Sequence, residues 1–378
     1  MVKIDASAIT YTKGGDISKI LQGTAFSIDT ETLGPKQVVV QALATPINPA
    51  DLNQLTGTYA SKPNFTSELG TPVPVAIGGN EGLYKVIEVG SDVTSYKNGD
   101  WVIPKMPSFG TWRTHAVVTL DKPENPDPFI KVSSEDDKSI DLTQAATVSI
   151  NPSTAYQLID QFIKDWDPKG NDWIIQNGGN SQVGKFVVQI AKIRNIKTIS
   201  VIRHGKPDQD QIVKELLDLG ATKVITDKEA ESEEYINKIV PGWVNEGKVI
   251  LALNCVCGKS GSALVSHLTG NHLADYRSPH LVTYGGMLGQ PLMYSSSESL
   301  FKNVTSKAYW LTANTKRNPQ SKIDTVKKVL DLYKSGDIKP VPFNGKEFNI
   351  KSTSDDYIKL FLKGIAESKT GKQVIVYN

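Results

Sequence analysis

Glycines and small polar residues between positions 176 and 185 are suited to binding an anionic group. They follow an apolar run, 172–176, that predicts a strand, and they precede a run, 183–193, with the apolar spacing of a helix. Glycines let a backbone approach a pyrophosphate closely, and the amides at a helix N-terminus favour an anion. Alignment on Gly179 and Gly184 places Ser181 where the Gly-x-Gly-x-x-Gly pattern has its middle glycine. The segment therefore predicts a dinucleotide-binding turn, and a glycine-rich turn without a ligand is the alternative.

The end of the next expected strand, 198–202, indicates which dinucleotide binds. A site for NAD needs a carboxylate there, because the carboxylate binds the ribose hydroxyls. Here Arg203 follows the strand, 19 residues after Gly184, and a guanidinium can bind a 2′-phosphate with two hydrogen bonds. Arg203 thus favours NADPH, and a solvated basic loop is the alternative. His204 lies in the same loop, where an exposed histidine is as often an ordinary surface residue as a ligand contact.

Few residues in the first 150 could bind a transition metal. This part of the chain contains one histidine, His115, and no cysteine, whereas zinc sites need thiolate or imidazole ligands. The segment 79–82 reads Gly-Asn-Glu-Gly, so that Asn80 stands where zinc alcohol dehydrogenases carry a histidine ligand. The other four histidines have no ligand spacing. We therefore expect no metal.

The two cysteines, Cys255 and Cys257, lie two positions apart near the end of an expected strand. A disulfide between them would strain the backbone. We therefore interpret both cysteines as small, inert apolar residues of a protein in a reducing compartment.

The overall composition is that of a globular protein. The chain has 378 residues, of which 39% are hydrophobic and 22% charged. Its 42 lysines and arginines exceed its 40 acidic residues by two, which gives no argument for a nucleic acid or a membrane surface as partner. No apolar run approaches the ~18 residues that a membrane helix needs. The first residues lack the features of a signal or transit peptide, which fits a cytosolic protein or a chain given without its presequence.

Two kinds of pattern divide the chain near residue 150. Short β-branched runs between glycine, proline and asparagine breaks predict a barrel-like, mostly β domain before it. After it, strands alternate with helices, which predicts a parallel, doubly wound sheet. The expected strands are 172–176, 198–202, 223–226, 249–253 and 281–284, and the expected helices are 183–193 and 209–219. Helices at 323–333 and 355–366 and a strand at 373–377 follow.

The fold class is therefore α/β, with a Rossmann-type doubly wound sheet and a barrel-like β domain. We expect residues 1–152 to form the first part of the β, substrate-binding domain. Residues 153–315 form the cofactor domain, and 316–378 return to the first.

These motifs resemble the zinc-free medium-chain dehydrogenase/reductase superfamily, and within it the mitochondrial trans-2-enoyl-thioester reductases of fungi. The similarity runs over nearly the whole chain. The motifs that carry it are 48–54, 57–59, 79–82, 110–112, 177–184, 201–203, 258–260 and 283–287. The Asn-Pro-x-Asp run that leads to Tyr59, taken together with Tyr-Gly-Gly-Met at 284–287, is the most specific part.

The resemblance implies NADPH-dependent reduction of a trans-2-enoyl thioester, carried by acyl carrier protein or CoA, to the saturated thioester. It further implies a homodimer in the mitochondrial matrix that serves fatty-acid synthesis. A quinone or enone reductase of the same superfamily is one alternative, and a non-catalytic NADPH-binding protein is another.

The resemblance also assigns roles to residues. Tyr59 matches the family's proposed proton donor, and the neutral polar groups of Asn53 and Gln54 are placed to orient Tyr59 or the thioester. Trp310 lies where the family's acyl cavity meets the nicotinamide, with core or interface packing as its alternative. Cofactor contacts are expected at Asn151, Asn180, Ser181, Gln182, Val183, Arg203, His204, Gly205, Tyr284, Gly285, Gly286, Met287, Tyr309, Trp310, Leu311 and Lys372, besides Gly178, Gly179 and Gly184 of the predicted turn.

The sequence departs from the family pattern at three positions. Ala60 follows Tyr59 where proline is usual, and Asn180 replaces a threonine in the turn. Gly205 replaces an arginine that commonly follows two residues after Arg203, which leaves fewer cations for a 2′-phosphate unless Lys206 substitutes.

The implied reaction needs a hydride at Cβ of the thioester and a proton at Cα. A tyrosine with a pKa near ~10 is protonated at neutral pH and can donate, and such a step contributes roughly 10²–10⁴-fold to the rate. Because acyl carrier protein is acidic, we also expect a basic docking patch.

Overall fold

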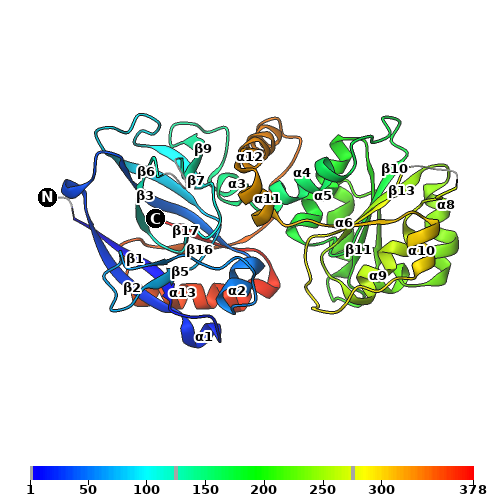
Figure 1. Cartoon of the computed structure of the whole chain (residues 1–378), viewed down its shortest axis with the longest axis horizontal. Helices are drawn as coiled ribbons and strands as arrows, with labels where there is room; N and C mark the ends of the chain where they lie inside the picture. The colour runs from blue at the N-terminus through cyan, green and yellow to red at the C-terminus, as the bar shows by residue number, and fades with distance from the viewer. Residues whose placement is uncertain (1–2, 123–126, 274–276) are drawn as a thin grey trace. The chain divides into compact units, whose positions relative to one another are not determined.

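The computed structural model describes residues 3–122, 127–273 and 277–378, and the chain divides into two compact units (Figure 1). Unit 1 comprises Met1–Ile150, Thr312–Lys334 and Pro342–Asn378, and unit 2 comprises Asn151–Leu311 and Ser335–Val341. Residues 335–341 group with unit 2, whereas the sequence had assigned all of 316–378 to the first domain. A reciprocal pair of hydrogen bonds explains this grouping. The backbone N–H of Lys339 donates to Gln189 Oε1 at 2.7 Å, and Gln189 Nε2 donates to the Lys339 carbonyl at 3.2 Å.

Unit 1 is built from two sheets. The larger sheet has the strand order β16-β17-β3-β6-β7-β9, with β8 paired to β3, and the smaller has the order β2-β1-β5-β4. All the strand pairs are antiparallel except β16 with β17. The strands are β1 Lys3–Tyr11, β2 Gln22–Asp29, β3 Gln37–Ile47, β4 Phe65–Thr66, β5 Val75–Ile77, β6 Leu83–Val89, β7 Asp100–Pro104, β8 His115–Thr119, β9 Phe129–Ser134, β16 Asn344–Phe348 and β17 Gln373–Tyr377.

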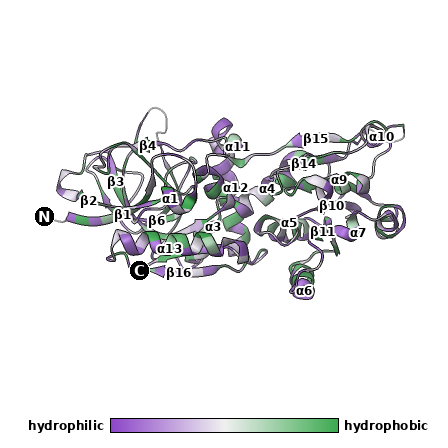
Figure 2. Ribbon diagram, turned by 90° about the horizontal axis from the view of Figure 1, so that it is seen from below, coloured by the Kyte–Doolittle hydropathy of each residue, from purple (hydrophilic) through white to green (hydrophobic). Residues whose placement is uncertain are grey.

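Helices close the sheets of unit 1. The long helix α13 has acidic residues in its first turn and buries Tyr357, Phe361 and Gly364, so that hydrophobic and hydrophilic residues both occur along it (Figure 2). Its aromatic side chains join the core formed by the central strand β3, which pairs with β6, β8 and β17. The helices are α1 Ile17–Ile20, α2 Pro49–Leu55, α3 Leu142–Thr147, α11 Leu311–Arg317, α12 Pro319–Lys334 and α13 Ser354–Glu367, with 3-10 turns at Thr30–Thr32 and Ser368–Thr370.

Unit 2 is a six-stranded parallel sheet in the order β12-β11-β10-β13-β14-β15, with helices on either side (Figure 1). The strands are β10 Asp172–Gln176, β11 Lys197–Ile202, β12 Lys223–Thr226, β13 Lys248–Asn254, β14 His280–Thr283 and β15 Thr305–Ala308. The helices are α4 Asn151–Phe162, α5 Gln182–Ile193, α6 Gln209–Leu219, α7 Asp227–Ala230, α8 Val240–Val244, α9 Gly258–His267 and α10 Ser296–Phe301, with a π-helix at Tyr235–Ile239.

The expected fold class is confirmed. The strands β10 and β12 begin and end where the sequence placed them. The helix α5 and the strand β11 begin one residue earlier than predicted, and β13 extends one residue further at each end. The inner strands β10, β11 and β13 are rich in apolar residues and buried along almost their whole length, which is typical of a parallel sheet. The edge strand β15 is instead largely exposed. The carboxyl ends of all the strands of this sheet lie at one edge, the edge at which α/β sheets bind ligands.

Candidate active site

The predicted dinucleotide turn lies between the carboxyl end of β10 and the start of α5. Gly178 has a φ of +60°, which an L-residue rarely adopts. A Cβ on Gly184 would lie 2.5 Å from the carbonyl oxygen of Gly179, so only glycine allows the helix to begin this close to the turn. Ser181 caps α5, since its Oγ accepts from the Gly184 N–H at 3.1 Å. The turn therefore has the backbone shape and the helix N-terminus that a pyrophosphate needs.

Asn177 holds this turn against the neighbouring strand β13. Its Oδ1 accepts from the Cys255 N–H at 2.8 Å, and its Nδ2 donates to Asn254 Oδ1 at 2.9 Å. The Tyr284 N–H donates to the Asn254 carbonyl and the Met287 N–H to that of Cys255, at 2.9 and 3.0 Å. The segments 178–184 and 284–287, both of which the sequence predicts to contact the cofactor, are thus tied to the same strand end.

The residues after β11 form an exposed loop with a fixed backbone. The His204 N–H donates to Asp227 Oδ1 at 2.9 Å and the Gly205 N–H to Gln209 Oε1 at 3.0 Å. Arg203 is exposed at the carboxyl end of this strand, next to the strand that carries the turn. The position suits a cation that contacts the 2′-phosphate of a dinucleotide.

Four further residues of unit 2 that the sequence predicts to contact the cofactor do not belong to the strand ends described above. Asn151 is the first residue of α4. Tyr309 is buried and donates from its hydroxyl to Gln157 Oε1 at 2.9 Å, and burial raises the pKa of Tyr309. Trp310 is 36% exposed, and Leu311 begins α11.

In unit 1 the helix α2 positions Tyr59. Asn48 and Asp51 form a capping box at its start, with Pro49 in the first turn. The Tyr59 N–H donates to the Asn53 carbonyl at 3.0 Å, so the loop folds back onto the helix that precedes it. The Tyr59 and Thr312 hydroxyl oxygens lie 3.4 Å apart. Tyr59 is half-buried and the Asn53 side chain is exposed.

Gln54 differs from Asn53 because it is buried and its amide is fully engaged. Its Nε2 donates to the Ser61 carbonyl and to Ser108 Oγ, both at 3.1 Å, and its Oε1 accepts from Asn80 Nδ2 at 3.1 Å. Of the two roles left open by the sequence, these contacts support orientation of the Tyr59 loop by Gln54.

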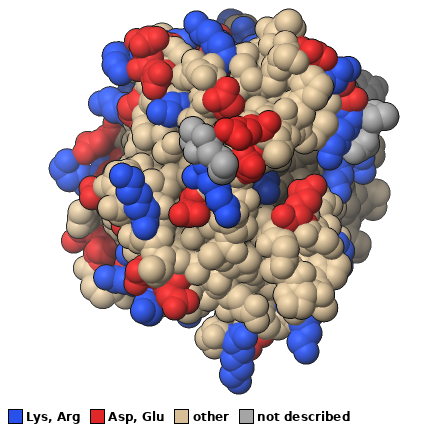
Figure 3. Space-filling model, turned by 90° about the vertical axis from the view of Figure 1, so that its left-hand side faces the viewer, with Lys and Arg blue, Asp and Glu red and all other residues tan. Residues whose placement is uncertain are grey.

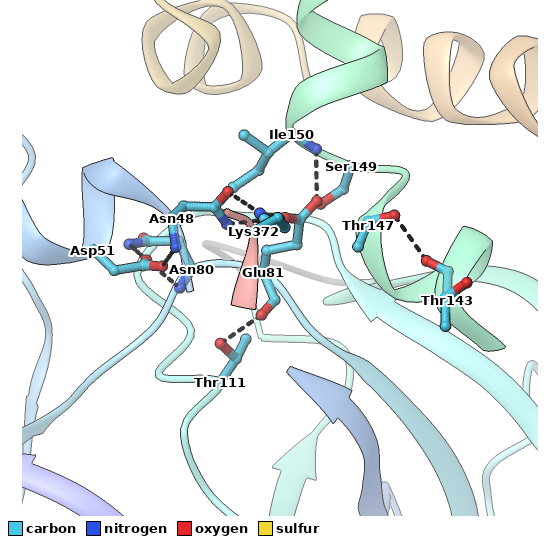
Figure 4. Close-up of polar contacts among 10 residues, drawn as sticks. All are labelled: Asn48, Asp51, Asn80, Glu81, Thr111, Thr143, Thr147, Ser149, Ile150 and Lys372. Atoms are coloured by element: carbon cyan, nitrogen blue, oxygen red, sulfur yellow. Dashed lines mark hydrogen bonds and ion pairs between the residues drawn. The ribbon is translucent and has the colours of Figure 1, made fainter. Parts of the chain in front are cut away.

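A buried polar cluster lies behind this loop, and Figure 4 shows its contacts. It consists of Asn48, Asp51, Asn80, Glu81 and Lys372, and none of these is more than 9% exposed. Burial, together with the nearby Glu81, raises the pKa of Asp51 to about 6, although hydrogen bonds from Asn80 and Asn48 and the charge of Lys372 oppose the shift.

The Glu81 carboxylate accepts three hydrogen bonds from two segments of unit 1. The Ile150 N–H donates to it at 2.8 Å, the Asn48 Nδ2 at 2.9 Å and the Ser149 hydroxyl at 3.2 Å. The Lys372 Nζ lies 3.7 Å from Glu81 Oε2 and donates to Asn48 Oδ1 (Figure 4). The structure thus places Lys372, a predicted cofactor contact, inside the buried cluster.

The sequence singled out neither Asp51 nor Glu81 as a site residue. The available signal was a carboxylate in each of two short motifs, 48–54 and 79–82, flanked by apolar residues. Only the fold brings these motifs together.

Over residues 3–122, 127–273 and 277–378, no group of three or more histidine, cysteine, aspartate or glutamate side chains is arranged to hold a metal ion. His115 is buried, and its ring Nδ1 lies 3.2 Å from Thr114 Oγ1. Burial lowers the pKa of His115 to about 4. In the same described ranges, no helix combines the length and the apolar character that a membrane crossing requires.

The expected basic docking patch is not evident on one face of unit 1. Figure 3 shows lysines, arginines and acidic side chains interspersed there. Around the Tyr59 loop, however, Lys62, Lys316 and Arg317 are exposed. Lys62 Nζ donates to the Gly57 carbonyl at 3.1 Å, and Lys316 Nζ lies 3.5 Å from Ser61 Oγ.

Residues 34–119 match the family model of the alcohol dehydrogenase GroES-like domain. Together with the parallel sheet of unit 2, this match defines a two-domain medium-chain dehydrogenase/reductase.

Relatives along the full length define the family. The chain is 97% identical over 378 residues to enoyl-[acyl-carrier-protein] reductase 1, mitochondrial, of Debaryomyces hansenii, with 100% of both chains covered. A threonine-to-valine mutant of Etr1p in complex with NADP and crotonyl-CoA matches with a TM-score of 0.91 and 39% identity over 100% of both chains. The Etr1p/Etr2p heterodimer of Candida tropicalis, a mitochondrial 2-enoyl thioester reductase, matches with a TM-score of 0.90 and 39% identity over 99% of this chain and 100% of that one. This chain belongs to the family of mitochondrial enoyl-[acyl-carrier-protein] reductases, which confirms the resemblance found in the sequence.

Proposed function

We propose that this protein reduces trans-2-enoyl thioesters of acyl carrier protein or CoA to the saturated thioesters, with NADPH, in mitochondrial fatty-acid synthesis. The observation that carries the proposal is the end-to-end likeness, at a TM-score of 0.91, to Etr1p in complex with NADP and crotonyl-CoA. The mitochondrial location follows the name of the 97% identical relative, and the matrix is our inference.

The carboxyl edge of the sheet in unit 2 fits the cofactor. The turn at 178–184 supplies a helix N-terminus, the loop at 203–205 an exposed guanidinium, and 284–287 a third strand end. We assign cofactor contacts to these segments and to Asn151, Tyr309, Trp310, Leu311 and Lys372. When bound there, NADPH supplies the hydride for Cβ of the substrate.

Tyr59 supplies the proton in this proposal. As Cβ gains the hydride, negative charge develops on the thioester oxygen and Cα of the substrate. The Tyr59 O–H bond then breaks, a C–H bond forms at Cα, and the phenolate takes a proton from water. The Thr312 hydroxyl, 3.4 Å from the Tyr59 oxygen, is placed to stabilise that phenolate.

The exposed cations Lys62, Lys316 and Arg317 around Tyr59 suit an acidic acyl carrier protein, because opposite charge speeds and orients encounter. Trp310, 36% exposed, is assigned to the acyl pocket, where a rigid aromatic ring offers a large apolar contact area.

We further propose a homodimer formed through unit 2. The strand β15 ends the six-stranded sheet, and within the described residues no strand pairs with its outer edge. Large apolar side chains are exposed in the segments before it, with Leu273 at 100%, Leu300 at 61% and Phe301 at 67%. The His272 N–H donates to the Phe301 carbonyl at 2.9 Å, which brings two of these segments together. Phe301→Glu should convert a dimer to a monomer in light scattering, and an unchanged mass would contradict this interface.

NADPH oxidation with trans-2-butenoyl-CoA, repeated with NADH and with Tyr59→Phe, tests the reductase. We expect turnover that prefers NADPH and falls by about 10²-fold or more in the variant. Wild-type protein that turns over no enoyl thioester, but does reduce quinones, would overturn the proposal. Turnover that persists in Tyr59→Phe would leave the reductase standing and remove Tyr59 as donor.

A further inference from the structure

Asn80 joins three segments of unit 1 through its amide group. Its Nδ2 donates to Asp51 Oδ1 at 2.8 Å and to Gln54 Oε1 at 3.1 Å, while its Oδ1 accepts from the Ser108 N–H at 2.8 Å. Its backbone N–H adds a further bond to Asp51 Oδ1 at 3.0 Å. The residue is only 9% exposed. All the polar groups of the amide are therefore used inside the protein.

Two of these partners continue to the loop that carries Tyr59. Gln54 Nε2 donates to the carbonyl of Ser61, two residues after Tyr59. Ser108 Oγ, which lies 3.1 Å from the same Nε2, also lies 3.3 Å from the Lys62 carbonyl. A continuous chain of hydrogen bonds therefore runs from Asp51 through Asn80 to the backbone of the Tyr59 loop.

The chemistry of these contacts requires a neutral amide at position 80. The side chain must donate to the carboxylate of Asp51 and to the amide oxygen of Gln54, and it must also accept from an N–H. A carboxylate cannot donate, and an apolar residue would leave buried polar groups without hydrogen-bond partners.

We propose that Asn80 is a positioning residue that fixes the Tyr59 loop through Gln54 and Ser108. This inference rests on the proposed function, because it assigns to Asn80 an effect on the reaction that acts through the proton donor. Asn80 itself need not touch the substrate or the cofactor.

A double-mutant cycle with Tyr59→Phe and Asn80→Ala tests the proposal. The readout is kcat for NADPH oxidation with trans-2-butenoyl-CoA. We expect Asn80→Ala to lower kcat by about 10-fold to 100-fold when Tyr59 is present, because small misplacements of catalytic groups cost that much. In the Tyr59→Phe background it should change kcat by about twofold or less, since interacting sites are not additive. The Kd for NADPH, measured by fluorescence, should not change.

A matched control separates positioning from loss of stability. Thr10 is fully buried in β1, and its hydroxyl lies 2.7 Å from that of Thr24, so neither residue belongs to the chain of hydrogen bonds between Asp51 and the Tyr59 loop. Thr10→Val should lower the melting temperature but leave kcat unchanged. If Asn80→Ala lowers kcat by the same factor in both Tyr59 backgrounds, or weakens NADPH binding by that factor, Asn80 does not act through Tyr59 and the proposal is wrong.

If the Asn80→Ala variant fails to fold, the Asn80→Asp variant provides a second test of the proposal. It preserves the size of the side chain but sets a carboxylate against Asp51, in a site that Tyr11, Glu81 and Lys372 also face. One proton shared by the two carboxylates restores their hydrogen bond. The ratio of the kcat of the Asn80→Asp variant to the kcat of wild type should therefore rise as the pH falls from 8 towards 6. A constant ratio of the two activities over this range would contradict the proposal.

The two hypotheses fail in different ways. Wild-type turnover of the enoyl thioester tests the function and does not depend on Asn80. Wild-type turnover that persists in Tyr59→Phe overturns the role of Asn80 while the reductase assignment stands.

Discussion

Unit 1 and unit 2 hold their candidate site residues by different means. In unit 2 the residues 178–184, 203–205 and 284–287 follow strands of one parallel sheet, so the backbone pairing of the sheet brings them to one edge, and side chains such as Asn177 fix only the local turns. In unit 1 the Tyr59 loop depends on side-chain hydrogen bonds between segments far apart in the sequence. Asn48 and Glu81 are 33 positions apart, and Lys372 is 324 positions from Asn48. A single substitution should therefore disturb the scaffold of unit 1 much more than that of unit 2.

The largest effect is expected for Glu81→Ala. It leaves the buried ammonium of Lys372 without its ion-pair partner, and the side-chain N–H of Asn48 and the backbone N–H of Ile150 without their acceptor. Removal of one partner of a buried ion pair typically costs about 3–5 kcal/mol. Amide hydrogen exchange should show lost protection in β17 and β3 of unit 1 but not in β10 of unit 2.

The control for this prediction is Glu135→Ala, because Glu135 is 52% exposed and pairs with Lys85 at 3.4 Å. An exposed pair contributes about 1 kcal/mol or less. Equal loss of protection in both units after Glu81→Ala would contradict the expectation that a single substitution disturbs unit 1 more than unit 2.

Lys322 should give the next largest effect, with a distinct dependence on pH. It is buried in α12, and its Nζ donates to the Pro104 carbonyl at 3.1 Å. Burial lowers the pKa of Lys322 to about 8, and the charge of Glu81 opposes the shift. The unfolded chain thus binds more protons than the folded one between about pH 8 and 10.5, so wild-type stability rises with pH in this window.

Lys322→Met should therefore be more stable than wild type at pH 7, by up to about 3 kcal/mol, and the advantage should shrink as the pH rises through this window. Denaturant unfolding at pH 7 and at pH 9.5 measures it. Lys328→Met, at an exposed position of the same helix, is the control. If the difference in the free energy of unfolding between Lys322→Met and wild type does not depend on pH, the buried charge of Lys322 does not destabilise the protein.

In unit 2, Arg203→Ala should affect the ligand but not the scaffold. Loss of charge-assisted hydrogen bonds to the 2′-phosphate, worth about 1.5–3 kcal/mol, should raise the KM for NADPH about 10-fold to 100-fold. The KM for NADH and the melting temperature should not change. Lys238→Ala, an exposed cation elsewhere in unit 2, is the control. An equal change for both cofactors would argue against a phosphate contact.

The smallest effect is expected for Gly205→Arg. Nothing lies within 4 Å of a Cβ at this position, but its φ of +74° disfavours any L-residue. We expect a few-fold rise in the preference for NADPH over NADH and a loss of about 1–2 kcal/mol in stability. Gly205→Ala carries the same backbone cost without the charge. An Arg variant with the cofactor preference of the Ala variant would place the 2′-phosphate away from this loop.

The same contrast explains how much the sequence could predict. Five of the six strands, the helices α5 and α6 and the dinucleotide turn of unit 2 follow from local apolar periodicity and glycine placement, since each βαβ element repeats one pattern. The sequence predicted neither the edge strand β15 nor the helices α4, α7, α8, α9 and α10. The sequence also indicated the Tyr59 motif, although only through the family resemblance.

Local patterns could not reveal the engaged amide of Gln54 or the buried cluster around Glu81. These depend on contacts between α2, the 79–82 loop and the C-terminal strand, and no periodicity encodes such contacts. Nor did the sequence separate 335–341 from the rest of the C-terminal part, because that grouping depends on a reciprocal pair of hydrogen bonds with Gln189 of α5.

The position of β17 has a consequence for the order in which the protein folds. This strand, Gln373–Tyr377, lies between β16 and β3 in its sheet, although it comes after all the other described strands in the sequence. Neither neighbour can complete its hydrogen bonds before residue 377 has left the ribosome. Unit 2 is nearly continuous in sequence, so its sheet has all six strands available some 70 residues earlier. During synthesis unit 2 can thus mature first, while the larger sheet of unit 1 still lacks β17.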